Sequence, residues 1–83
     1  MNEQNIKEIL KTIVMEITEI EDFEEDQNFI EDLGIDSMMT IEIVARIEKK
    51  FKITVPESDL PRLTNLHQTC LCVQEIISEM QTA

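Results

Sequence analysis

The sequence predicts an all-α fold, a small bundle of three to four helices with a long ordered first loop, on three observations. Apolar residues recur at three- and four-residue spacing in three segments, which is the spacing of one face of a helix. The chain has only one glycine and two prolines, too few for the many turns of an all-β domain. Its 83 residues are the size of one small domain, so we expect a single domain over 1–83.

The first helix is predicted at about 3–17. A single apolar stripe runs along this segment, and Lys7 and Lys11 lie off the stripe. Its members are Ile6, Ile9, Leu10, Ile13, Val14 and Ile17.

The loop that follows, 18–36, is strongly acidic, because residues 16–36 hold ten of the eighteen acidic residues and no basic one. A connection this long is either functional or packed by its own side chains. Asn28 followed by Glu31 resembles a capping box, which predicts a short helical turn, and Gly34 fits the left-handed position that ends such a turn. The apolar anchors that we expect are Ile20, Phe23, Phe29, Ile30, Leu33 and Ile35.

The second helix is predicted at about 37–51. Its apolar stripe is expected to comprise Ile41, Val44, Ile47 and Phe51, helped by Met38 and Ala45. The C-terminal end of this helix is basic, and cations there complement the helix dipole. These cations are Arg46, Lys49, Lys50 and Lys52. The run at 51–55 alternates apolar and polar residues, but a lone strand has nothing to pair with.

Two further helices are predicted, a short one at about 58–62 and a last one at about 65–80. Pro56 and Pro61 bracket the short segment. Candidate caps are Ser58 or Asp59 for the short helix and Thr64 for the last helix. The stripe of the last helix is Leu66, Cys70, Val73, Ile77 and Met80, with Ile76 alongside.

The charge balance of 7 basic and 18 acidic residues disfavours nucleic acid and anionic membrane surfaces as partners, and it favours basic proteins or divalent cations. No apolar stretch approaches the roughly 20 residues of a membrane span, and 1–5 does not resemble a signal peptide. Cys70 and Cys72 are too close in sequence to staple a fold. We expect them to be reduced, and the protein to be cytoplasmic without membrane insertion.

Ser37 is the residue singled out for chemistry. It stands where a helix is predicted to begin, and helix N-termini offer free N–H groups that favour a phosphate. The structural alternative is that Ser37 or Asp36 merely caps the helix. Catalysis by Ser37 is disfavoured, because the only candidate base, His67, is expected at the start of another helix.

Metal and acid–base sites are not predicted. The acidic run from Asp22 departs from an EF-hand at its sixth and twelfth positions, which are Gln27 and Leu33. Neighbouring carboxylates such as Glu31 and Asp32 are interpreted as solvated charges, since a small helical domain has little room for a cleft that shifts their pKa values.

The segment LGIDSMMTIEI at 33–43 resembles the attachment motif of acyl and peptidyl carrier proteins, a D-S-[L/M] signature preceded by L-G-x. The segment FKITVP at 51–56 resembles the one that follows the second helix of these carriers. LTNL at 63–66 resembles the entry to their last helix. The resemblance covers about residues 5–80, with the order and spacing of the elements intact.

The resemblance implies an acyl-carrier-like bundle that is not an enzyme. A phosphopantetheinyl transferase would move 4′-phosphopantetheine from coenzyme A to Ser37, with Asp36 helping the transferase to position its metal and substrate. The terminal thiol would hold acyl intermediates as thioesters. The carrier, a monomer, would present them to ketosynthase, acyltransferase and other acyl-processing enzymes.

The face around Ser37 is the predicted docking surface, because contacts with successive enzymes must be brief and partly electrostatic. Candidate docking residues are Met38, Met39, Glu42 and Glu48. A pair of adaptable methionines suits several partners, although Met38 has an alternative place in the core.

The segment DSMMTIEIVARI at 36–47 indicates the biosynthetic pathway. It resembles the type I polyketide pattern D-S-L-M-x-x-E-L-x-x-R-L, which Met39, Glu42 and Arg46 match. We therefore expect polyketide or hybrid polyketide–peptide synthesis. A fatty-acid carrier is the first alternative, but those usually have an acidic residue where Met39 stands. A D-alanyl or peptidyl carrier is the second alternative.

Pro61 departs from the family pattern and predicts a third helix of one turn.

The sequence is also compatible with two other classes of protein. A helical interaction domain that keeps the fold without being a carrier would have an unmodified Ser37. A metal-binding protein that uses the acidic loop would bind its ion tightly and stoichiometrically.

Overall fold

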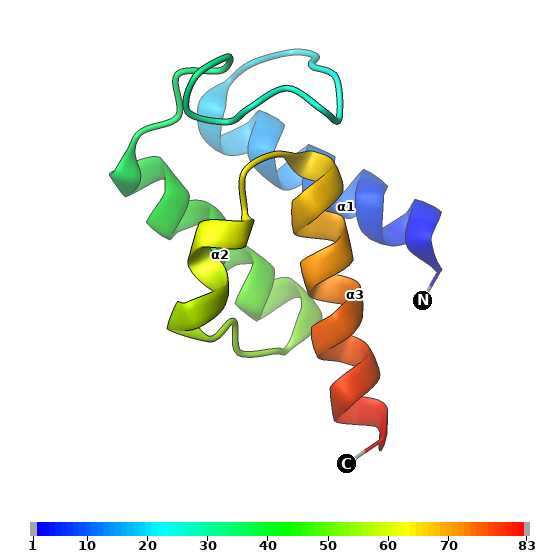
Figure 1. Cartoon of the computed structure of the whole chain (residues 1–83). Coiled ribbons are helices and arrows are strands. Elements are labelled where there is room, and N and C mark those ends of the chain that lie inside the picture. The colour runs from blue at the N-terminus through cyan, green and yellow to red at the C-terminus, as the bar shows by residue number, and fades with distance from the viewer. Residues whose placement is uncertain (1, 83) are drawn as a thin grey trace.

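The computed structural model describes residues 2–82, and the side chains of 2–80, as an all-helical protein with no strand in that range. The all-α prediction is confirmed. The elements are α1 (Glu3–Thr18), α2 (Ser37–Phe51), the 3₁₀ helix η1 (Glu57–Arg62) and α3 (Leu66–Thr82), shown in Figure 1. No described helix is both long enough and apolar enough to cross a membrane.

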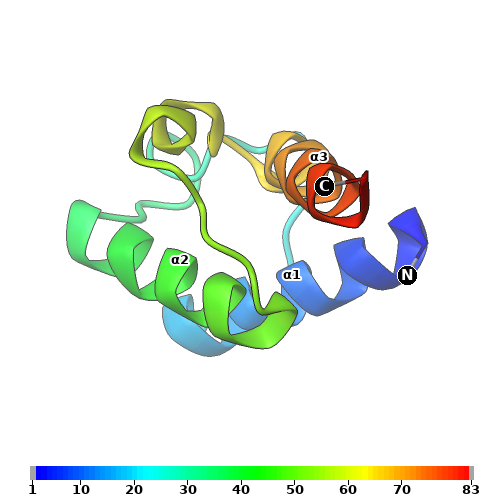
Figure 2. The same ribbon diagram turned by 90° about the horizontal axis from the view of Figure 1, so that it is seen from below.

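The helix α1 is the element on which the others are assembled, since it packs against both α2 and α3, while η1 packs on α3. Seen from below, α1 and α2 lie on one side of the molecule and η1 and α3 on the other (Figure 2). Asn2 caps α1 by accepting a 2.9 Å hydrogen bond from the Asn5 N–H.

The core lies between these elements. Four residues of the stripe predicted for α1 are buried in it, namely Ile6, Leu10, Ile13 and Val14. Both cysteines are buried and free, and burial raises the pKa of each thiol. The other buried apolar residues are Phe23, Phe29, Ile35, Ile43, Ile47, Ile53, Val55, Leu66, Val73 and Ile76. Ile53 and Val55 enter the core from an extended segment that pairs with no strand among residues 2–82.

The long acidic loop is packed by its own apolar side chains, which is one of the two alternatives considered from its length. Phe23 and Phe29 meet edge to face with ring centroids 6.4 Å apart, and both are buried. Backbone hydrogen bonds fasten the loop to the start of α3, from Phe29 N–H to the Thr64 carbonyl and from His67 N–H to the Glu25 carbonyl. The prediction that Ile30 is an apolar anchor of the loop is wrong, because its side chain is exposed.

The turn at the end of the loop differs in one partner from the predicted capping box. Asn28 Oδ1 accepts hydrogen bonds from the N–H groups of Ile30 and Glu31. The reciprocal acceptor is Asp32 instead of Glu31, since Asp32 Oδ2 receives the Asn28 N–H at 2.8 Å. Gly34 has φ +70°, the left-handed conformation expected at this position.

The stripe predicted for α2 is partly wrong. Ile47 is buried and Val44 and Phe51 pack against the core, but Ile41, Met38 and Ala45 are exposed. Ile43 is buried in place of Ile41. The face that meets α1 is therefore turned by a fraction of a helical turn from the predicted one.

The predicted caps of the last two helices are also wrong. Asn65, not Thr64, caps α3, with its Oδ1 accepting the Gln68 N–H at 2.7 Å. The residue before η1 is Pro56, and no side chain caps this helix, so neither Ser58 nor Asp59 has that role. Pro61 lies inside η1, which spans six residues. Met80, expected in the α3 stripe, is exposed.

Candidate functional site

Ser37 is the first residue of α2, and it is exposed. The end of α2 where it lies is at the periphery of the molecule, next to the loop and far from both chain ends (Figure 1). Within residues 2–82 its hydroxyl makes no hydrogen bond. A first-turn residue of a helix also lies where backbone N–H groups are unsatisfied and the dipole favours negative charge.

The backbone just before Ser37 is held firmly from the core side. Ile35 is fully buried, and its N–H donates to the Phe29 carbonyl at 2.9 Å. The left-handed Gly34 turns the chain between the loop and this anchor. As a result α2 begins at a defined place with its first side chain pointing into solvent.

Asp36 caps α2. Its Oδ1 accepts the Met39 N–H at 2.9 Å, and its carbonyl accepts the N–H and the hydroxyl of Thr40, each at 3.0 Å. The capping role considered for Asp36 is therefore present, and Ser37 is left free of it. The exposed carboxylate stands one residue before the serine hydroxyl.

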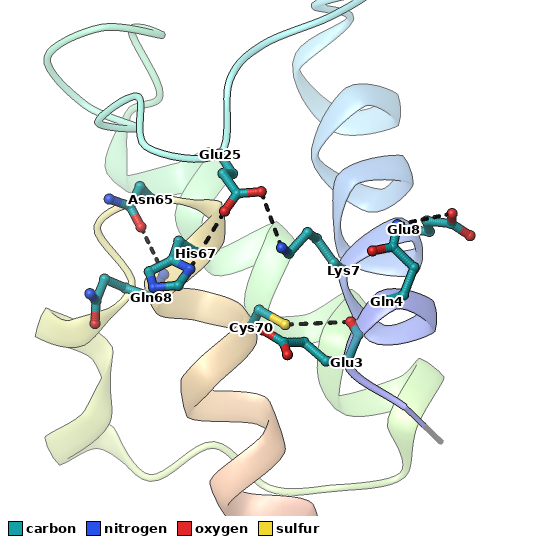
Figure 3. Close-up of polar contacts among 9 residues, drawn as sticks. All are labelled: Glu3, Gln4, Lys7, Glu8, Glu25, Asn65, His67, Gln68 and Cys70. Atoms are coloured by element: carbon teal, nitrogen blue, oxygen red, sulfur yellow. Dashed lines mark hydrogen bonds and ion pairs between the residues drawn. The ribbon is translucent and has the colours of Figure 1, made fainter.

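His67, the candidate base considered for Ser37, lies beside a carboxylate of the acidic loop. The protein's one histidine, His67, sits at the start of α3, where its Nδ1 lies 3.6 Å from Glu25 Oε1. Figure 3 shows Glu25 between His67 and Lys7, whose Nζ is 3.1 Å from Glu25 Oε2. The Glu25 hydrogen bond raises the pKa of Lys7. This cluster ties the loop to α1 and α3.

The outer face of α2 next to Ser37 is apolar and exposed. The exposed fraction is 79% for Met38 and 70% for Ile41, and Glu42 is exposed beside them. Met39 is half-buried and packs against the core. The exposure of Ile41 was not predicted, although its position four residues after Ser37 places both on one face of the helix.

Glu48 lies at the far end of α2 and has a structural role. Its Oε2 accepts the Val55 N–H at 2.8 Å, and its carbonyl accepts the N–H of Ile53 at 3.1 Å. These bonds hold the extended segment against the helix end. Met38, Met39 and Glu42 thus lie within the first two turns of α2, after the capping Asp36, and Met39 packs against the core, whereas Glu48 lies eleven residues after Ser37 near the helix end.

The described residues bring together no group of three or more His, Cys, Asp or Glu side chains that could hold a metal ion. The carboxylates of the acidic loop instead form separate contacts. Asp22, for example, pairs with Lys11 at 2.7 Å, and this hydrogen bond lowers the pKa of Asp22.

Comparison with known proteins gives relatives of one kind. Residues 8–73 match the family model described as a phosphopantetheine attachment site. An acyl carrier protein of Guillardia theta is 40% identical over 70 residues, which cover 82% of this chain and 86% of that protein. The Polyketide-8 synthase acyl carrier protein 2 of Streptomyces avermitilis is 35% identical over 65 residues, 76% of this chain and 75% of that protein.

A longer relative matches through one segment only. The non-reducing polyketide synthase dbaI of Emericella nidulans is 42% identical over 76 residues, which are 90% of this chain but 3% of that enzyme. The matching family carries a covalently attached 4′-phosphopantetheine group, and its acyl carrier proteins are carriers, not catalysts. This chain belongs to the phosphopantetheine-attachment family and is an acyl carrier protein.

Proposed function

We propose that Ser37 is the residue that carries 4′-phosphopantetheine in this protein. The observation that carries the proposal is the exposed, unbonded Ser37 hydroxyl at the first position of α2, within the matched segment 8–73. A side chain there can reach the active site of another enzyme without any unfolding. When bound, the group supplies a terminal thiol that holds an acyl group as a thioester.

A phosphopantetheinyl transferase would load the carrier. The transfer forms a bond between Ser37 Oγ and a phosphorus of coenzyme A, breaks the pyrophosphate bond and releases adenosine 3′,5′-bisphosphate. The serine proton would pass to a base of the transferase, since His67, the one histidine of the chain, lies beside Glu25. Asp36, with its exposed carboxylate beside the hydroxyl, would bind the metal and substrate complex of the transferase.

The docking surface would be the outer face of α2, with Met38, Met39 and Glu42 as its predicted residues. Exposed Ile41 extends its apolar part. Ketosynthase, acyltransferase and other acyl-processing enzymes would bind this face in turn, each briefly, with the carrier as a monomer. Glu48 stays a predicted docking residue, although its carboxylate is engaged by Val55.

The cargo that we propose is a polyketide or hybrid polyketide–peptide intermediate. Support comes from Met39, Glu42 and Arg46 at the positions of the polyketide pattern, and from two relatives whose names are those of polyketide proteins. The alternatives are a fatty-acid carrier or a D-alanyl or peptidyl carrier. Accurate mass of the acyl group released from protein made in its native host separates the three. A cytoplasmic location also stays a prediction.

Loading in vitro tests the attachment site. The purified chain is incubated with coenzyme A and a transferase of broad specificity, and intact mass is recorded. The wild type should gain one phosphopantetheinyl group, Ser37→Ala none, and Ser58→Ala, which alters another exposed serine, one. A modified Ser37→Ala variant, or a wild type that stays unmodified, would refute the proposal.

A further inference from the structure

The described residues include a second surface feature, a groove between α1 and the C-terminal half of α2. It is open to solvent and has a volume of about 700 Å³. Ile9 and Ile13 of α1 form an apolar floor, and Arg46, Lys49 and Lys50 of α2 form a basic wall. The volume is in the range of ligand-binding clefts.

The cations of this wall are available for a partner. Elsewhere Lys7, Lys11 and Arg62 are engaged by the carboxylates of Glu25, Asp22 and Glu75. Within residues 2–82 Lys49 and Lys50 have no ion pair. Arg46 has only a long contact of 3.8 Å with Glu16, which lines the opposite wall. Glu8 and Glu16 of α1 also line the groove, so its basic side lies across the apolar floor from an acidic side, in a protein with a net charge of −11.

The groove is separate from the attachment site. Lys49 lies twelve positions after Ser37 in the same helix, so the two are roughly 18 Å apart along its axis, at about 1.5 Å per residue. An occupant of the groove would leave the first turn of α2 uncovered. A partner could therefore stay bound here while other enzymes use the face around Ser37.

We propose that this groove binds an amphipathic helix of a partner protein that has an acidic flank. A helix laid between two helices presents an apolar stripe to Ile9 and Ile13. Its carboxylates would face Lys49 and Lys50. The opposite wall carries Glu16, so acidic residues on the second flank would be repelled, and this asymmetry fixes the direction of the bound helix.

The test uses a designed 18-residue peptide with leucines at helical spacing and glutamates along one flank, titrated into the full, isotopically labelled chain. Backbone amide shifts should move at Ile9, Ile13 and Lys49 and not at Ser37. Lys49→Glu should weaken binding about tenfold, since it replaces one attraction by a repulsion. Lys52→Glu makes the same charge change outside the groove and should leave the affinity unchanged.

Several outcomes would overturn the proposal. One is an affinity of Lys49→Glu for the peptide that equals that of the wild type, and another is equal binding of a peptide with lysines in place of the glutamates. The others are amide shifts centred on Ser37, dimerisation that fills the groove with a second copy, and no binding at millimolar peptide. If Lys49→Glu does not fold, Lys49→Gln replaces it, with a smaller expected loss of about threefold. Loading of Ser37 in the Lys49 variants should match the wild type, which separates this test from that of the carrier function.

Discussion

Asp36 caps α2 and has a proposed second role toward the transferase, and the two roles need different properties of its side chain. Its Oδ1 caps α2 through the Met39 N–H, which needs an oxygen acceptor but no charge. Its proposed role toward the transferase needs the negative charge. Because asparagine keeps the acceptor and loses the charge, substitution can separate the two tasks.

We expect Asp36→Asn to keep nearly the full free energy of unfolding and to be loaded much more slowly than the wild type. Asp36→Ala should lose the cap as well and be less stable by about 0.5–2 kcal/mol. Urea unfolding measures the first quantity, and the initial rate of phosphopantetheine transfer measures the second. Loading of Asp36→Asn at the wild-type rate would show that the charge has no role.

Single-residue predictions from the sequence were most reliable where the local backbone demands one residue type. Gly34 was placed in the left-handed region because it is the one residue without a Cβ cost there. Thr64 was chosen as a cap although Asn65 performs this role, because both residue types cap helices. The choice is made by tertiary contact, since the Thr64 carbonyl is engaged by Phe29 of the distant loop.

At the scale of elements, the apolar periodicity of α2 does not decide which face of the helix is buried. Apolar residues at 38, 39, 41, 43, 44, 45 and 47 cover more than half of its circumference, so two stripes fit the sequence. The face that packs on α1 depends on the route of the preceding loop. Ile41, four residues from Ser37, is left exposed, on the face proposed for docking.

The register of α2 predicts that substitutions of Ile47 and Ile41 have very different effects on the free energy of unfolding. Ile47 is 0% exposed, so Ile47→Ala should cost about 2–5 kcal/mol, and Ile47→Val about 0.5–1.5 kcal/mol. Ile41→Ala should change the free energy of unfolding by less than about 0.5 kcal/mol, because its side chain is already in solvent. Chemical denaturation measures all three. A larger loss for Ile41→Ala than for Ile47→Ala would contradict this register.

The attachment of η1 to α3 includes an ion pair that should depend on pH. Arg62 Nη2 lies 2.6 Å from Glu75 Oε2, and this bond lowers the pKa of Glu75 below its ordinary value of 4.5. A lowered pKa in the folded state stabilises the fold above the ordinary value, and this contribution is lost as pH falls through the lowered one. Both side chains are exposed, so the contribution is small.

Glu75→Gln should therefore be slightly less stable than the wild type at about pH 7, and the difference should shrink as pH falls below the ordinary Glu75 pKa of 4.5. Glu57→Gln removes the same charge from an exposed position of η1 without an ion pair, and it serves as the control. Urea midpoints across this pH range measure both variants. A destabilisation of Glu75→Gln that persists unchanged at low pH would mean that packing, not the ion pair, is lost.

At the scale of the molecule, charge is segregated along the fold. Ten of the acidic residues lie in 16–36, beside the start of α2, and four of the seven basic residues lie in 46–52 at its other end. The acidic segment ends one residue before the proposed attachment site, and the basic end borders the groove. Crowding of like charge in the loop opposes folding.

Salt should therefore stabilise the protein by screening. Raising NaCl from low to physiological concentration should raise the melting temperature by a few degrees, since about 1 kcal/mol shifts it by roughly 4–8 °C in a domain of this size. Magnesium should act a little more strongly at equal ionic strength, without stoichiometric binding. Calorimetry that finds tight binding of one calcium ion per chain would instead support the metal-binding alternative.

The central claim is that Ser37 carries the prosthetic group in the living cell. The most direct measurement is peptide mass spectrometry of the protein purified from its native host, with fragmentation that assigns the modified residue. The account predicts phosphopantetheine on Ser37, with or without an acyl group, and on no other residue. An unmodified Ser37 in protein made alongside its own transferase, or the group on a different side chain, would contradict it.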